Sequence, residues 1–80
     1  MIILNCALKH GITKRGIEMA VSNPIAMRRR NFEPPSHIEV AGADEKGNLI
    51  EVLVAEQEDG ELIAYHAMKL TEKMSKELDL

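Results

Sequence analysis

Three histidines are the side chains of this 80-residue chain best suited to move protons near neutral pH, because imidazole titrates in that range. His10 precedes Gly11 at an expected helix end, where an imidazolium would bond the last carbonyls, so a capping role is favoured for it. His37 alternates with Glu39 in an expected strand, and exposed strand polarity is the simpler interpretation of that position.

His66 is expected on an otherwise apolar strand face, because a period of two places it beside Ala64 and Met68. A histidine in such surroundings is more often a satisfied core or rim residue than a catalyst. Both interpretations stay open. If the chain has an acid and a base, His37 and His66 are the candidates.

The chain has one basic run, Arg28, Arg29 and Arg30, whose guanidinium groups could each bind two phosphate oxygens. In a strand, Arg29 points away from Arg28 and Arg30, so at most two of the three can serve one site. A solvated edge strand protected by charge explains the run equally well. Lys9 and Lys69 could extend a basic surface, although each also suits a helix end or a solvated position.

Composition limits what such a site could bind. The net charge of -3 and the pI near 5.5 exclude a uniformly basic nucleic-acid binder. Aromatic residues make up only 2% of the chain, Phe32 and Tyr65, so any bound RNA would be held mostly through its phosphates. Cys6 is the single cysteine, and no zinc spacing or Gly-rich phosphate loop occurs, so neither a metal nor a cofactor is predicted.

The length predicts one domain over residues 1–80. No apolar run approaches the roughly 18 residues that cross a bilayer. Residues 1–8 are too short for a secretory signal. The sequence therefore predicts a cytoplasmic protein with no membrane partner.

Three helices are expected around a sheet. Residues 3–10 fit a strand or a helix, and Gly11 after them favours a short helix. A second helix begins after Thr13, a good N-cap, and stops at Pro24, which cannot donate the next helical bond. The last helix follows Thr71, again as the cap.

A near-alternating pattern predicts four strands, at residues 25–32, 37–43, 49–56 and 61–68. Glycine-containing turns between the later strands favour antiparallel hairpins, and the strand at 49–56, apolar on both faces, is expected in the centre. The predicted fold class is α+β: a four-stranded antiparallel sheet with two N-terminal helices and one C-terminal helix.

Several short sequence segments follow one another along the chain in an order that can be compared with known families. They are Lys9-His10-Gly11-Ile12-Thr13 before a helix, Asn23-Pro24 after it, Gly42 before a charged turn with Gly47, and a closing strand that runs into Lys69 and Thr71. Together they resemble the BrnT-like toxins, members of the broader RelE-type toxin class, over about residues 5–77. The resemblance implies a RelE/BrnT-like arrangement of the elements above.

The resemblance also implies a function: the toxin component of a bacterial toxin-antitoxin pair, a metal-independent endoribonuclease that inhibits translation or growth and is neutralised by an antitoxin protein. In such RNA cleavage a base activates the ribose 2′-hydroxyl, cations stabilise the charged phosphate, and an acid protonates the leaving oxygen. The assigned residues are His37 and His66 for catalysis and, for RNA phosphate, Arg28, Arg30, Lys9 and Lys69.

Two positions depart from the pattern of the BrnT-like toxins. Where those chains tend to have an arginine shortly before the matched Gly42, this chain has His37. Where their last strand tends to end in a Ser-Ala-Arg-like run, this chain has His66-Ala67-Met68, and methionine cannot stabilise a pentacovalent phosphate. The alternative function is therefore a non-catalytic, toxin-derived binding module that pairs with an antitoxin or with itself, as a toxin-antitoxin complex or a homodimer.

Overall fold

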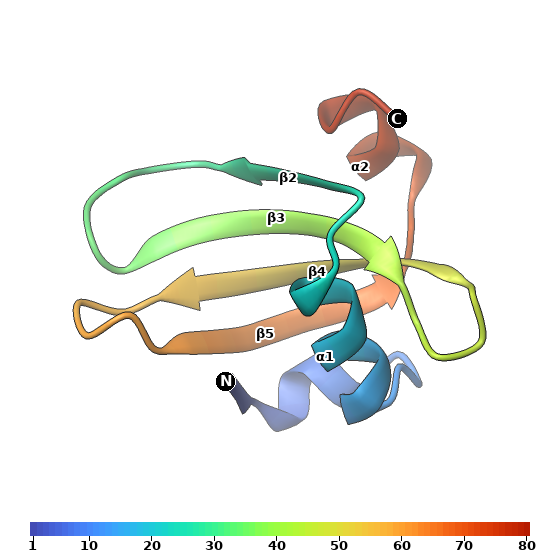
Figure 1. The fold of residues 1–80 in the computed structure, drawn as a ribbon, viewed down its shortest axis with the longest axis horizontal. Helices are drawn as coiled ribbons and strands as arrows, with labels where there is room; N and C mark the ends of the chain where they lie inside the picture. Colours follow the sequence, from blue (N-terminus) through green and yellow to red (C-terminus); the bar gives the residue numbers. More distant parts are fainter.

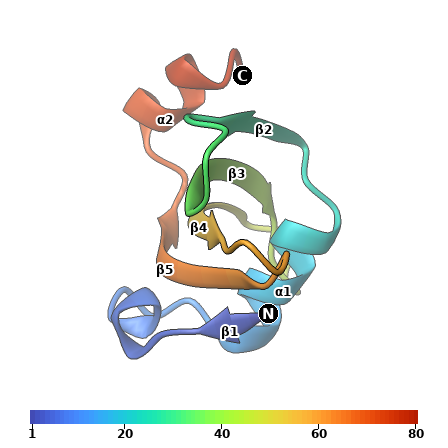
Figure 2. The ribbon, with the colours of Figure 1, turned by 90° about the vertical axis from the view of Figure 1, so that its left-hand side faces the viewer.

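Five strands form one mixed sheet in the computed structural model, which describes residues 1–80 (Figure 1). The elements in chain order are β1 (Ile2–Ile3), the 3-10 helix η1 (Asn5–Leu8), α1 (Lys14–Ser22), β2 (Ala26–Arg29), β3 (Ser36–Ala43), β4 (Leu49–Glu56), β5 (Leu62–Lys69) and α2 (Glu72–Glu77). The strands lie side by side in the order β1-β5-β4-β3-β2. Figure 2 shows α1 and α2 on opposite sides of this sheet.

Both α-helices begin where their capping threonines predict. The Thr13 hydroxyl accepts a hydrogen bond from Gly16 N at 3.0 Å, and the Thr71 hydroxyl accepts one from Met74 N at 3.2 Å. Each bond satisfies an amide that has no partner within its helix. α1 ends at Ser22, before Asn23-Pro24, as expected from the missing proline donor.

Antiparallel pairing joins β2 to β3, β3 to β4 and β4 to β5. Gly47 and Gly60 adopt φ of +82° and +85° in the two hairpin turns, a conformation that glycine takes without steric cost. β4 is the central strand of the five, which confirms the expectation from its apolar residues on both faces.

The main apolar core lies between α1 and one face of the sheet. We call this the helix-covered face, and it comprises Ile38, Val40, Ile50, Val52, Val54, Ala64 and Ala67. Ile17 and Ala20 of α1 pack onto it and are fully buried. Gly42 lets α1 approach β3 closely, because a Cβ at that position would lie 2.7 Å from the backbone oxygen of Ala20.

The expectation of a four-stranded antiparallel sheet with three helices is wrong at the N-terminus. Ile2–Ile3 pair in parallel with Ile63 and Ala64 as a fifth strand, and η1 is a single 3-10 turn. Leu4 N also donates to Ala64 O at 3.0 Å, so the edge of β5 satisfies the backbone at the start of the chain.

The four-stranded, three-helix arrangement attached to the RelE/BrnT-like resemblance is corrected accordingly: the chain is α+β with a five-stranded mixed sheet, two α-helices and one 3-10 turn. The apolar residues near the N-terminus fit a helix and a strand equally, so contact with β5 decided between them. Neither α1 nor α2 has the length and apolar character needed to span a membrane.

Candidate functional site

The face of the sheet opposite α1 carries most of the candidate site residues. We call it the polar face, and it comprises Arg28, Arg30, His37, Glu39, Glu51, Leu53, Tyr65 and His66. α2 covers part of this face and leaves a cavity of about 230 Å³ between the helix and the strands. The side chains that could do chemistry therefore come from four adjacent strands, β2 to β5.

Glu39 organises the arginines of the polar face. Its side chain is only 1% exposed, and Oε1 accepts from Arg28 Nε at 2.8 Å. Glu77 of α2 adds a second carboxylate, 3.4 Å from the Arg28 guanidinium. Arg28 is thus held between two carboxylates, which limits the charge that it can offer to a phosphate.

Arg30 is held more loosely than Arg28. Its side chain is 57% exposed, and its guanidinium stands 3.6 Å from Glu39 Oε2, beyond hydrogen-bond distance. Its donors are therefore open to an incoming anion. Arg29 points to the other face, as its position in a strand predicts, and its Nη1 bonds Glu56 at 2.9 Å and Ser36 at 2.7 Å.

Glu51 is the second buried carboxylate of the polar face, and it connects His66 to α2. Oε2 lies 3.2 Å from His66 Nε2, and Oε1 accepts from both the backbone N and the hydroxyl of Thr71 at 2.9 and 2.6 Å. The ring of His10 stacks edge-on against His66, with centroids 5.8 Å apart. His66 is consequently fixed in orientation by a carboxylate and a second imidazole.

A β-bulge in β5 places Tyr65 and His66 together. Val54 pairs with Ala64 and Leu53 pairs with His66, so Tyr65 is the extra residue. After the bulge the alternation of side chains is reversed, which is why Ala64 and Ala67 both reach the helix-covered face.

The expectation that His66 shares a face with Ala64 is therefore wrong. His66 contacts Glu51 on the polar face, and Ala64 lies in the core on the other side. One inserted residue moves His66 from the expected apolar strand face to the polar face, where its side chain is partly exposed.

His37 and Tyr65 form a second polar pair. His37 Nδ1 lies 2.9 Å from the Tyr65 hydroxyl, and the two rings meet edge to face. Burial raises the pKa of the Tyr65 phenol above its ordinary value, although the Arg30 charge opposes the shift and the Glu39 charge adds to it. The phenol therefore keeps its proton at neutral pH, and its hydroxyl can donate a hydrogen bond.

The two candidate histidines do not touch each other. His37 pairs with Ala55 and His66 pairs with Leu53, so one strand and two residues separate them. Strand spacing and rise put their Cα atoms about 12 Å apart. Tyr65, which bonds to His37 and adjoins His66 in the bulge, lies between the two imidazoles.

The structure does not bring Lys9 and Lys69 to this cluster by any direct contact. Lys69 follows Met68 in β5, so its side chain points to the opposite face. It lines a separate cavity beside the β3–β4 hairpin, together with Thr13 and Asp44. Lys9 is exposed at the end of η1 and adjoins His10 in sequence. Of the six residues assigned from the sequence, Arg28, Arg30, His37 and His66 thus share the polar face.

Three residues of the polar face have roles that were not predicted from the sequence: Glu39, Glu51 and Tyr65. Glu51 offered a usable signal, because a carboxylate within an apolar central strand must be buried with partners. Tyr65 offered none, since the bulge that turns it beside His66 depends on pairing with β4. No group of three or more His, Cys, Asp or Glu side chains is arranged to hold a metal ion.

Comparisons with known proteins find no match: no family model, no curated protein and no solved structure matches this chain. Chemically, the polar face combines an imidazole oriented by a carboxylate, a protonated phenol bonded to a second imidazole, and an exposed guanidinium. This set could move two protons and stabilise one anion.

Proposed function

We propose that the polar face cleaves RNA, and that the protein is the toxin component of a bacterial toxin-antitoxin pair. One observation carries the catalytic part: the bulge in β5 aims Tyr65 and His66 at the same partly open face, and each is tied to a further side chain, His37 or Glu51. Arg30 stands on that face with free guanidinium donors. The toxin role rests on the sequence resemblance.

The proposed reaction is attack of a ribose 2′-hydroxyl on the adjacent phosphorus. His66, oriented by Glu51, takes the hydroxyl proton as the new O–P bond forms. The Arg30 guanidinium stabilises the negative charge on the phosphate oxygens. The Tyr65–His37 pair gives a proton to the departing 5′ oxygen as its bond to phosphorus breaks, which leaves a 2′,3′-cyclic phosphate and a free 5′-hydroxyl.

The other parts of the proposal follow from the toxin role. The setting is the bacterial cytoplasm, where messenger RNA is the substrate. The partner is an antitoxin protein that blocks the polar face. Arg28 supports Arg30 by sharing Glu39 with it, and Lys9 and Lys69 attract RNA only at long range.

The test is RNA cleavage by purified protein, followed by analysis of the product ends. We expect cyclic phosphate ends, with rates lowered about 100-fold in His66→Ala and in Tyr65→Phe, a typical effect of removing an acid or base. Arg30→Ala should also lose cleavage, whereas the control Arg15→Ala, at an exposed position of α1, should retain it. An intact RNA pool with folded protein, or full activity in His66→Ala, would refute the assignment.

A non-catalytic binding module is the second candidate function, and the charge balance of the polar face favours it. Glu39 lies against both Arg28 and Arg30, and Glu77 also pairs with Arg28, so little positive charge is left over. In that case expression of the protein alone would leave growth and RNA unchanged. Binding to a partner, rather than turnover, would then be the property to measure.

A further inference from the structure

β2 is the open edge of the sheet. It is the last strand in the order β1-β5-β4-β3-β2 and pairs only with β3. The opposite edge is protected, because β1 has just two residues and η1 packs beside β5. Any addition of a strand to this protein would therefore take place at β2.

The free backbone groups of β2 can be located from its pairing with β3. Arg30 N donates to His37 O at 2.7 Å, and Arg28 pairs with Glu39 in the same register. Hydrogen bonds alternate along an antiparallel pair, so the N–H and C=O groups of Met27 and Arg29 point away from β3. They form a short row of donors and acceptors at the edge, and this row ends before Ile25, whose N donates to Ala41 O of β3.

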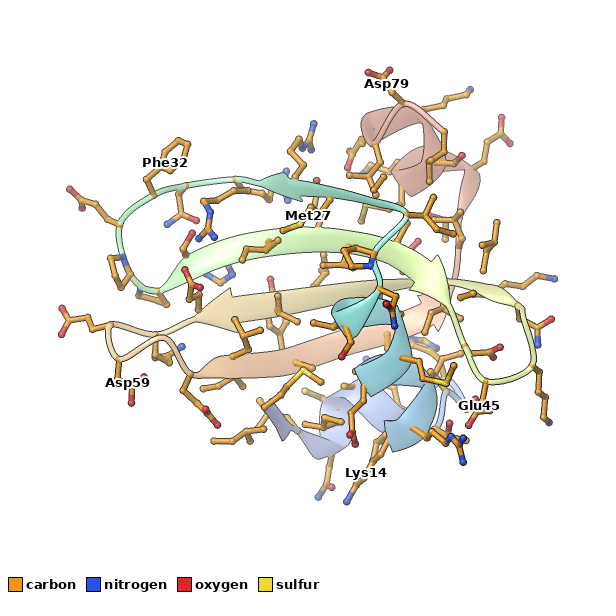
Figure 3. The ribbon with its side chains drawn as sticks, viewed as in Figure 1. Lys14, Met27, Phe32, Glu45, Asp59 and Asp79 are labelled. Atoms are coloured by element: carbon orange, nitrogen blue, oxygen red, sulfur yellow. The ribbon has the colours of Figure 1, made fainter.

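Apolar side chains are exposed along the same edge. Ile25 is 56% exposed, Met27 53% and Phe32 86%. In Figure 3 Met27 lies on β2, and Phe32 projects outward from the loop that follows this strand. Phe32 lies in an ordered loop, since the Asn31 side chain accepts from His37 N and donates to two loop carbonyls.

The arginines of β2 do not prevent another strand from pairing with this edge, as unpaired charges would. Arg28 is neutralised by Glu39 at 2.7 Å and Arg29 by Glu56 at 2.9 Å, both within the same chain. Paired charges repel a like strand weakly and attract an acidic strand weakly. This balance favours a second copy of the same edge over an acidic peptide.

We propose that two copies of this chain pair antiparallel through β2, with Met27 of each copy on the two-fold axis. In this register Met27 faces Met27, and Arg28 faces Ala26 of the other copy. Shifting the axis to Arg28 or to Arg29 would set arginine directly against arginine, which destabilises a strand pair. The result is one continuous sheet across both copies, independent of any RNA cleavage.

Cysteine cross-linking tests this register residue by residue, in a Cys6→Ser background because Cys6 is a free, exposed thiol. With Met27 on the axis, the two Met27 Cα atoms are about 5.5 Å apart, within the range of a disulfide. The matched control is Ala26→Cys, whose Cα atoms would be about 8 Å apart, which is too far. We expect Met27→Cys to form a covalent dimer with oxidised glutathione and Ala26→Cys to stay monomeric.

Sedimentation equilibrium supplies the second measurement. The Cys6→Ser protein should show a reversible monomer-dimer equilibrium, and Met27→Arg should weaken it about tenfold by placing like charges on the axis. A monomer at every concentration up to about 1 mM would overturn the proposal. Equal cross-linking at both cysteines, or a dimer unchanged by Met27→Arg, would also overturn it.

Discussion

The helix-covered face and the polar face are made of alternate residues of the same strands, yet different kinds of neighbours bury their side chains. Val52 is fully buried on the first face by aliphatic neighbours beneath α1. Glu39 and Glu51 are 1% and 5% exposed on the second, and each is buried together with partners that bond its oxygens. No buried side-chain oxygen or nitrogen lacks a hydrogen-bond partner.

This difference shows that close apolar packing stabilises one side of the sheet. Hydrogen bonds and ion pairs between buried polar side chains stabilise the other side. Removing a buried aliphatic group leaves a cavity, and the folded state loses both the burial energy of that group and the packing contacts around it. Removing a carboxylate that pairs with half-exposed arginines costs less, because water can reach the freed cations. The polar face can therefore hold reactive groups with a smaller penalty for change.

The largest expected effect comes from a cavity on the helix-covered face. Ile17 is fully buried between α1 and the sheet, so Ile17→Ala should lower the free energy of unfolding by about 3 kcal/mol. Urea denaturation measures this value. Ile25→Ala makes the same chemical change at a 56% exposed site and should cost less than about 0.5 kcal/mol in dilute protein.

A smaller loss is expected where α1 approaches β3. Gly42→Ala would place a Cβ 2.7 Å from Ala20 O, a rigid backbone atom, and should cost about 2 kcal/mol. Gly16→Ala is the control, because its Cβ would meet side-chain atoms no closer than 3.1 Å. Thermal unfolding would separate the two variants by several degrees, and equal melting temperatures would show that the contact at Gly42 is not tight.

On the polar face, loss of one charge should cost less than either change in the core. Glu39→Gln keeps the side-chain volume but removes the negative charge that faces Arg28 and Arg30, and we expect a loss of about 1.5 kcal/mol. Glu33→Gln, at an exposed loop position, should be neutral within about 0.5 kcal/mol. If Glu39→Gln cost as much as Ile17→Ala, the contrast between the two faces would fail.

The smallest effect concerns Tyr65, the single tyrosine, whose ionisation can be followed by its absorbance. Partial burial raises the pKa of its phenol, so titration of the folded protein should have a midpoint above the ordinary value of 10.0. The unfolded chain ionises first, so stability is constant below that value and falls as the pH rises above it. In urea the midpoint should return to the ordinary value, and the absence of any difference would show that the phenol is fully solvated.

The elements of this fold that depend on neighbouring residues could be predicted from the sequence. Thr13 and Thr71 cap their helices, Asn23-Pro24 follows α1, and Gly47 and Gly60 close the hairpins. Each of these signals acts over a few residues, through a hydrogen bond or a backbone angle that the residue itself supplies. The alternation that sends Arg28 and Arg29 to opposite faces is equally local.

Only the tertiary structure decided the rest. Ile2–Ile3 form a strand because the edge of β5 is beside them, and Tyr65 joins His66 on one face because β4 pairs with β5 around a bulge. The partners of Arg28 likewise come from a different strand, through Glu39, and from the far end of the chain, through Glu77. These features depend on which strands meet and in what register, and the energies that select the register arise between residues distant in sequence.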